Sequence, residues 1–96
     1  MTTWDPDWVI SPGETLREWI QENGFVLGDR LLVKPVATAC GRMDPKQLQG
    51  ILDGKRKISA VAAAKLQAGT GISASLWINL ERAFRQGLAE GKTWNP

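Results

Sequence analysis

The polar residues in the middle of the chain have the types and spacing of groups that recognise nucleic-acid bases. The chain offers an ammonium group at Lys46, amide groups at Gln47 and Gln49, and a bare backbone at Gly50. In the major groove of DNA, an ammonium group donates to guanine O6 or N7, and an amide pairs with N6 and N7 of adenine. Gln47 lies nearest the expected apolar stripe, so we expect Lys46 and Gln49 to be the principal base-reading residues. Gly50 would let the backbone approach the DNA closely.

Basic side chains flank these residues and favour an anionic partner. Residues 28–67 hold eight basic and three acidic side chains, a net charge of +5, whereas residues 1–27 hold one basic and five acidic side chains, a net charge of −4. Each phosphate that a basic residue neutralises releases condensed counterions, which favours binding to DNA. The side chains predicted to contact phosphates are Arg42, Lys55, Arg56 and Lys57. A solvated basic surface without a partner is the alternative interpretation.

A short helix is predicted to present the polar groups. Asp44 can accept hydrogen bonds from the free N–H groups at a helix start, and Pro45 suits the first helical position because it has no N–H group. The expected apolar stripe of this helix consists of Leu48, Ile51 and Leu52. A preceding helix is expected from Pro35 to a tight turn at Gly41, and Met43 is expected to fill the core between the two helices.

These two helices, at residues 35–53, resemble a helix-turn-helix motif. The similarity extends to WDPDWVISPGETLREWIQENG at residues 4–24, ILDGKRKIS at 51–59 and GISASLWINLE at 71–81. Together these segments resemble the HigA-type antitoxins, a branch of the XRE or lambda-repressor-like regulators. The resemblance implies a compact, all-α, five-helix DNA-binding domain whose second motif helix enters the major groove. It is interrupted at residues 25–33, where relatives have a shorter turn and then a helix that opens with Ser-Gln or Thr-Gln.

The segments before the motif are predicted to form an arm, a helix and an insertion. Residues 1–10 are expected to be a short extended arm whose two tryptophans, Trp4 and Trp8, pack against the body of the fold. A helix follows from a capping box, in which Ser11 accepts from the N–H group of Glu14. In the insertion, Asp29 is predicted to cap a short helical turn.

Two helices are expected to complete the domain. The first follows Ser59, and its expected apolar face consists of Val61, Ala64, Leu66 and Ala68. The second spans about residues 73–90. Its expected core residues are Leu76, Trp77 and Leu80. Three apolar residues at or beyond its end are predicted to contact a second subunit or another partner: Phe84, Leu88 and Trp94.

The composition argues against several classes of function. The 96 residues include no histidine and one cysteine, which excludes histidine triads, His-ligated metal sites and thiolate zinc sites. We therefore expect no catalysis, metal or cofactor, and we expect Cys40 to be a small buried residue. A single domain over residues 1–96 is expected in the cytoplasm. The reasons are the lack of a signal peptide or membrane-length apolar run and a cysteine that cannot form an internal disulfide.

Two functions remain open on the sequence. The chain is predicted to be a sequence-specific DNA-binding transcriptional regulator, a repressor of the antitoxin or the phage and mobile-element type. We expect it to act as a homodimer on a palindromic double-stranded operator. The resemblance implies the antitoxin type, whose further partner would be a cognate toxin protein. The alternative is a protein-interaction module that neutralises a toxin or binds a host factor and has little or no specific affinity for DNA.

Overall fold

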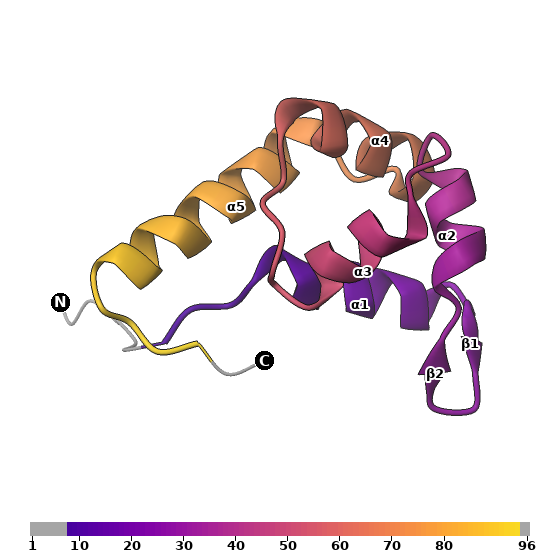
Figure 1. Cartoon of the computed structure of the whole chain (residues 1–96), viewed down its shortest axis with the longest axis horizontal. Coiled ribbons are helices and arrows are strands. Elements are labelled where there is room, and N and C mark those ends of the chain that lie inside the picture. The colour runs from indigo at the N-terminus through magenta and orange to yellow at the C-terminus, as the bar shows by residue number, and fades with distance from the viewer. Residues whose placement is uncertain (1–7, 95–96) are drawn as a thin grey trace, which may run out of the picture.

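Residues 8–94 are described by a computed structural model, in which they form five helices and a two-stranded antiparallel hairpin (Figure 1). In chain order the elements are α1 (Pro12–Glu22), β1 (Val26–Leu27), β2 (Arg30–Leu31), α2 (Val33–Ala39), α3 (Pro45–Leu52), α4 (Ala60–Thr70) and α5 (Ala74–Ala89). The predicted all-α class and five-helix fold are confirmed. None of these helices is long and apolar enough to cross a membrane. The predicted packing of Trp4 lies outside the described residues, and Trp8 is 47% exposed, so its predicted packing against the body of the fold is at most partial.

Side-chain caps begin four of the described helices. The cap residues of α3, α4 and α5 accept from backbone N–H groups two or three positions further on, at 2.9, 3.1 and 3.2 Å, as expected. Ser11 caps α1, but it accepts from the N–H group of Gly13 at 3.0 Å, so the predicted bond to Glu14 is wrong. The N–H group of Glu14 donates instead to the backbone carbonyl oxygen of Ser11, also at 3.0 Å. The helix therefore begins as predicted, through a different bond.

The insertion between α1 and α2 is a β-hairpin, so the predicted helical turn capped by Asp29 is wrong. Val26 pairs with Leu31 across the two strands, and the two-residue loop at the tip begins with Gly28, whose φ is 65°. A glycine with positive φ at the first loop position is typical of a type II′ turn, which matches the twist of paired strands. The loop geometry therefore favours a hairpin where the capping pattern suggested a helix.

The hairpin also decides where α2 begins. The N–H group of Leu32 donates to the carbonyl oxygen of Phe25 at 2.8 Å, which closes the hairpin directly before the helix. The Phe25 ring stacks on Trp19 with 5.7 Å between the ring centroids, so the base of the hairpin is held against α1. α2 then begins at Val33, two residues before the predicted start at Pro35. The first four N–H groups of a helix have no partner within it, so proline loses no hydrogen bond at the third position.

The main core lies between α1, α2, α3, α4 and the first half of α5. It consists of these buried side chains: Leu16, Ile20, Val36, Ala37, Cys40, Met43, Leu48, Ile51, Leu52, Ile58, Ala62, Ala63, Leu66 and Trp77. The start of α1 meets the end of α3 without intervening side chains, because a Cβ atom at Gly13 would overlap the carbonyl oxygens of Ile51 and Leu52. This contact brings the N-terminus of α1 to the C-terminus of α3, where the opposite partial charges of the two helix ends attract each other.

α4 and α5 do not bury all the residues that their patterns predict. The buried side chains of α4 are Ala62, Ala63 and Leu66. Val61 is 67% exposed, so the predicted apolar face of α4 is largely wrong. In α5, Trp77 is fully buried as predicted, but Leu76 is 45% exposed. An alanine-rich helix offers several sides of similar size and hydrophobicity, so its sequence does not define one face for packing.

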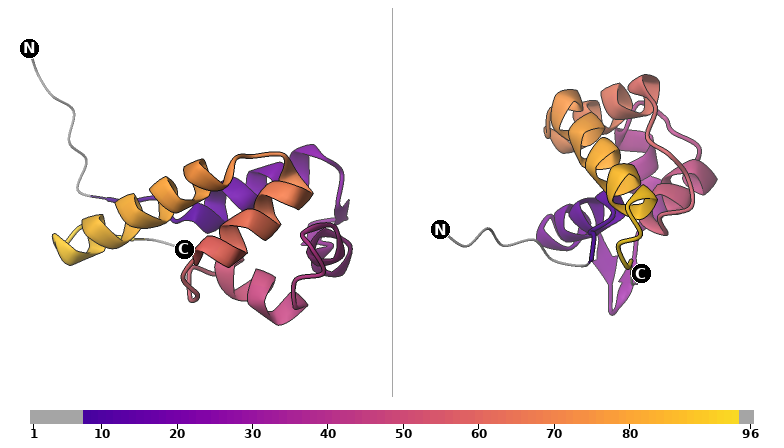
Figure 2. Two further views of the ribbon diagram at one scale, coloured as in Figure 1. Left: turned by 90° about the horizontal axis from the view of Figure 1, so that it is seen from above. Right: turned by 90° about the vertical axis from the view of Figure 1, so that its left-hand side faces the viewer.

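The second half of α5 packs against the two ends of the described chain. We call residues 82–89, together with residues 8–10 and 91–94, the outer end. Figures 1 and 2 show these segments together, at the opposite end of the molecule from α2 and the hairpin. The N–H group of Val9 donates to the carbonyl oxygen of Thr93 at 2.9 Å, which joins the two terminal segments.

Side chains at the outer end form a small apolar cluster of their own. Phe84 is 1% exposed, because the Trp94 ring packs edge-on against it with 5.2 Å between the ring centroids and an interplanar angle of 79°. The structure therefore places Phe84 inside the subunit, although its sequence position suggested a partner contact. Leu88 is partly exposed and remains open to a partner.

Candidate nucleic-acid interface

α3 turns an apolar side toward the core and a polar side toward solvent. The buried side consists of Leu48, Ile51 and Leu52, each no more than 5% exposed. Lys46 and Gln49 are exposed, and Gln47 is half-buried between the two sides. Residues three positions apart share one face of a helix. The ammonium group of Lys46 and the amide group of Gln49 therefore project together from the molecule.

The Gln49 amide is held along the surface of α3. Its Nε2 atom donates to Oδ1 of Asp53 at 3.0 Å, one helical turn further on. An amide has two N–H donors and a carbonyl acceptor, so this bond leaves one donor and the acceptor available. A bidentate pair with adenine uses one donor and one acceptor. Asp53 therefore orients the amide without removing the groups that an adenine would need.

The turn between α2 and α3 carries Arg42 at the surface. Gly41 and Arg42 both have left-handed backbone conformations, with φ values of 62° and 57°. A non-glycine residue adopts this conformation at a cost of about 1–2 kcal/mol. Met43 follows at 2% exposure, and its N–H group donates to the carbonyl oxygen of Ala37 at 2.9 Å. Met43 thus fills the core between the two helices as predicted, and its packing holds Arg42 in place beside the start of α3.

The basic segment, residues 55–57, folds back over the end of α3. The N–H groups of Lys55 and Arg56 both donate to the carbonyl oxygen of Gly50, at 2.9 and 3.1 Å. Gly54 permits the reversal because its φ is 72°. The three basic side chains of the segment are exposed. The predicted phosphate contacts are thereby held close to the predicted base-reading residues.

Gly50 makes room for the stem of Arg56. A Cβ atom at Gly50 would lie 2.6 Å from Cγ and 2.7 Å from Cδ of Arg56, so the arginine stem lies directly on α3. The sequence suggested that this glycine leaves the helix backbone open to DNA. In the structure its bare surface receives a side chain whose guanidinium group belongs to the same predicted interface.

Glu81 of α5 anchors the residue that follows the basic segment. This glutamate is 8% exposed, and its Oε1 atom accepts from the N–H group of Ile58 at 3.3 Å. Its Oε2 atom accepts from Nε of Arg85 at 2.6 Å. The basic segment is therefore fixed at both ends, by Gly50 and by Glu81. The sequence analysis missed Glu81, because its partner lies 23 residues away and neither residue type signals the pairing.

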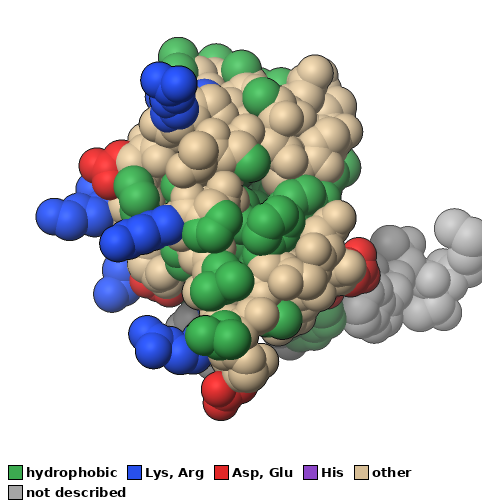
Figure 3. Space-filling model, turned by 90° about the vertical axis from the view of Figure 1, so that its right-hand side faces the viewer, with side chains coloured by type: hydrophobic (Ala, Val, Ile, Leu, Met, Phe, Trp, Pro, Cys, Tyr) green, Lys and Arg blue, Asp and Glu red, His purple; other side chains and the backbone are tan. Residues whose placement is uncertain are grey.

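On one face of the molecule, basic side chains gather on the side toward α3 (Figure 3). Figure 3 shows the face that carries α2 and the hairpin. Lys and Arg side chains stand along its left side, toward α3, and hydrophobic side chains cross its middle. One exposed hydrophobic residue of the hairpin is Leu27, at 70% exposure. A basic side and an apolar side thus meet at the helix-turn-helix.

The remaining predicted residues lie elsewhere or are buried. Leu88 belongs to the outer end, whereas the ring of Trp94 reaches from the outer end to Gly54, just after α3. Cys40 is fully buried as predicted, and burial raises the pKa of its thiol above the ordinary value of 9.0. Among residues 8–94, no group of three or more His, Cys, Asp or Glu side chains is arranged to hold a metal ion.

Comparison with known proteins supports the helix-turn-helix interpretation. The chain is similar to the solved structure of an addiction module antidote protein of a HigA family from Coxiella burnetii, with a TM-score of 0.70. The two are 29% identical, and the match covers 88% of this chain and 86% of that chain. No protein-family model matches the chain, and no curated protein matches it. The structural match confirms the resemblance to HigA-type antitoxins and supports an antitoxin-type regulator of the helix-turn-helix class.

Proposed function

We propose that this chain is a sequence-specific DNA-binding transcriptional regulator of the antitoxin type, which reads the major groove with α3. The observation that carries the proposal is the exposed pair Lys46 and Gln49, which lies between Arg42 and the anchored basic segment. Each good base contact from this pair discriminates by about 1–3 kcal/mol. Gln47 completes the surface that faces the bases, whereas the stem of Arg56 covers Gly50.

The phosphate contacts in this proposal are Arg42, Lys55, Arg56 and Lys57. They set the overall affinity and its salt dependence with little preference for sequence. Because the backbone at both ends of the basic segment is fixed, its side chains start from fixed positions before DNA binds. Less conformational entropy is then lost on binding than with a free loop.

A homodimer on a two-fold operator is the working form that we propose. One α3 presents few base contacts, and a second subunit doubles them at a fixed spacing. Leu88 and Trp94, which are both partly exposed, are the proposed contacts with the second subunit or with a cognate toxin. As an antitoxin, the chain would bind its toxin and repress its own operon.

A fluorescence anisotropy titration tests the DNA proposal. The probes are the DNA upstream of the chain's own gene and a scrambled duplex of the same composition. Lys46→Ala and Gln49→Ala should each weaken specific binding by about 5- to 150-fold, equivalent to 1–3 kcal/mol, and affect the scrambled duplex much less. Arg82→Ala is the charge-matched control on α5. Gln86→Ala is the amide-matched control, because its Nε2 atom also donates to a carboxylate one turn further on, at 3.3 Å.

Equal affinity for the two duplexes, unchanged by Lys46→Ala and Gln49→Ala, would reject the specific regulator. Replacing Arg42 or any residue of the basic segment with alanine should weaken binding to both duplexes. Each lost phosphate contact should lower the slope of log affinity against log salt by about 0.9.

The second candidate is a protein-interaction module with little specific affinity for DNA. The exposed apolar residues favour it, since Leu27 is 70% exposed on the hairpin and Leu76 is 45% exposed on α5. Co-purification with the product of a neighbouring toxin-like gene, combined with equal weak binding to both duplexes, would select this candidate. Specific DNA binding that survives without any protein partner would reject it.

A further inference from the structure

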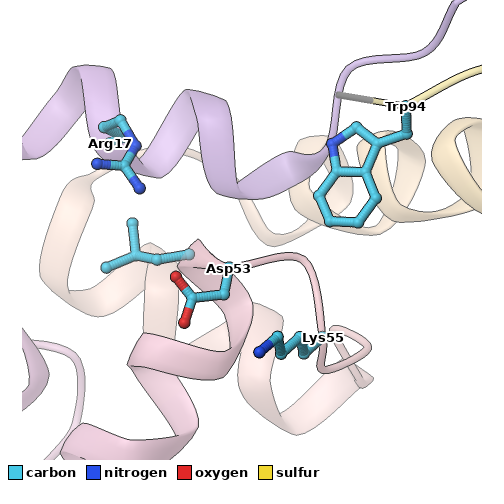
Figure 4. A pocket seen from close by; sticks show the side chains of 5 residues that line it. Arg17, Asp53, Lys55 and Trp94 are labelled. Carbon is cyan, nitrogen blue, oxygen red and sulfur yellow. The ribbon is translucent and has the colours of Figure 1, made fainter. Parts of the chain in front are cut away.

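We infer that the hollow between α1, the end of α3 and the C-terminal segment binds a small monocarboxylate with an apolar body. The hollow has a volume of about 320 Å³ and is lined by Arg17, Leu52, Asp53, Lys55 and Trp94 (Figure 4). Small-molecule sites in proteins begin at about 300 Å³ and combine apolar walls with a few polar groups. This hollow has both features, and the proposed contacts with bases do not use it.

The charged side chains around the hollow favour a ligand with a single negative charge. In Figure 4, Arg17 of α1 and Lys55 of the basic segment lie on opposite sides of Asp53. Within residues 8–94, no hydrogen bond or ion pair joins the side chain of Arg17 or Lys55 to another residue. Two unpaired cations favour a carboxylate, because either can donate a charge-assisted bond to it. The carboxylate of Asp53 disfavours a ligand with two or more negative charges.

The apolar walls select a ligand with a hydrocarbon body. Leu52 at the end of α3 and the ring of Trp94 supply apolar lining. The ring rests on Gly54, where an added Cβ would overlap its Cη2 and Cζ2 atoms. The indole nitrogen of Trp94 is buried and has no hydrogen-bond partner among the described residues. The ring can therefore shift to admit a ligand without breaking a hydrogen bond.

Occupation of the hollow would act on DNA binding through Lys55. This part of the inference rests on the proposed function, in which the same ammonium group contacts a phosphate. A ligand carboxylate that pairs with Lys55 withdraws that group from the DNA. We therefore expect the ligand to lower the affinity for both specific and scrambled duplexes.

Isothermal titration calorimetry on the full chain without DNA tests the site itself. The probes are phenylbutyrate, the alcohol and the primary amine with the same hydrocarbon body, and inorganic phosphate. Phenylbutyrate should bind at least about tenfold more tightly than each of the others, since only its single carboxylate gains charge-assisted bonds without repulsion from Asp53. Arg17→Gln and Lys55→Gln should each weaken phenylbutyrate about tenfold, and Asp53→Asn should strengthen it. Arg82→Gln, which removes a charge on α5, should leave the affinity unchanged.

Two outcomes would overturn the site: no saturable binding of phenylbutyrate at millimolar concentration, or equal affinity for the carboxylate, the alcohol and the amine. Circular dichroism of each variant separates a lost site from a lost fold. Anisotropy with phenylbutyrate added tests the coupling separately. Binding that leaves the affinity for both duplexes unchanged would overturn the proposed effect on Lys55 but not the site. Because the calorimetry contains no DNA, its result stands even if the chain does not bind DNA.

Discussion

The main core and the outer end are held together by different kinds of contact. In the main core, helices pack on helices, and α1 approaches α3 through bare backbone at Gly13. At the outer end, one helix meets two extended terminal segments, and Phe84 is covered by the ring of Trp94. Regions with fewer packed helices open at lower free energy than the core of a domain. The comparison therefore predicts that the base-reading helix sits on the rigid part of the molecule and that the outer end opens locally.

The largest predicted effect comes from two aromatic residues of α5. Trp77 lies in the main core and Phe84 in the outer end, and neither is more than 1% exposed. Trp77→Ala should lower the free energy of unfolding by about 3–5 kcal/mol, and Phe84→Ala by an amount at the lower end of that range, because the terminal segments can collapse onto the gap. Urea denaturation measures both values.

Amide hydrogen exchange tests whether the main core and the outer end open independently. Phe84→Ala should speed amide exchange at the outer end and leave α3 protected. Trp77→Ala should speed exchange throughout the main core. If Phe84→Ala exposes α3 to the same degree as Trp77→Ala does, the two regions form one cooperative unit and the comparison fails.

The next prediction compares the effect on stability of replacing two helical glycines, Gly13 and Gly50. Gly13→Ala should lower the free energy of unfolding by about 1–3 kcal/mol, because the added methyl group meets rigid backbone of α3. Gly50→Ala is the matched control, since its methyl group meets only the flexible stem of Arg56. It should raise stability by up to about 1 kcal/mol through helix propensity. Thermal unfolding followed by circular dichroism measures the change in stability for both variants. Equal changes for Gly13→Ala and Gly50→Ala would show that the close approach of α1 and α3 does not constrain residue 13.

Substitutions at Glu81 test whether α5 holds the basic segment in position. Glu81→Ala leaves the buried N–H group of Ile58 without its acceptor. We expect a loss of about 1–2 kcal/mol, in the lower part of the range for such a donor, because the bond is long at 3.3 Å. Glu81→Gln keeps an acceptor oxygen and gives up only the partly exposed ion pair with Arg85, a loss below about 1 kcal/mol. Amide exchange at residues 55–58 should rise in the alanine variant only, and an unchanged rate would remove Glu81 as a positioning residue.

The smallest predicted effect is a pH dependence confined to the main core. Burial raises the pKa of the Cys40 thiol above its ordinary value of 9.0, so the folded chain retains a proton that the unfolded chain releases. The stability contributed by the neutral thiol is therefore full below about pH 9 and falls as the pH rises toward the folded value. Urea titrations at several pH values should show this fall in the natural chain and not in Cys40→Ala, and parallel curves for the two would contradict it.

The sequence was sufficient where the signals are local. The start of α3 follows from Asp44 and Pro45, and its two sides follow from the spacing of Lys46, Gln49 and the buried aliphatic residues. The same holds for the exposure of the basic segment, because charged groups are costly to bury. These features depend on contacts within a few residues of one another, so a pattern in the chain specifies them.

Only the tertiary structure decided the features that join distant parts of the chain. The alanine-rich α4 has no single apolar side, so the neighbouring helices selected the face that it buries. The segments at the two chain ends bury Phe84. Glu81 of α5 accepts a hydrogen bond from the loop that carries the basic segment. The hollow likewise unites Arg17, the end of α3 and Trp94 from three separate segments. Such pairings depend on the relative placement of whole helices, which the packing of the complete chain fixes and short-range spacing does not encode.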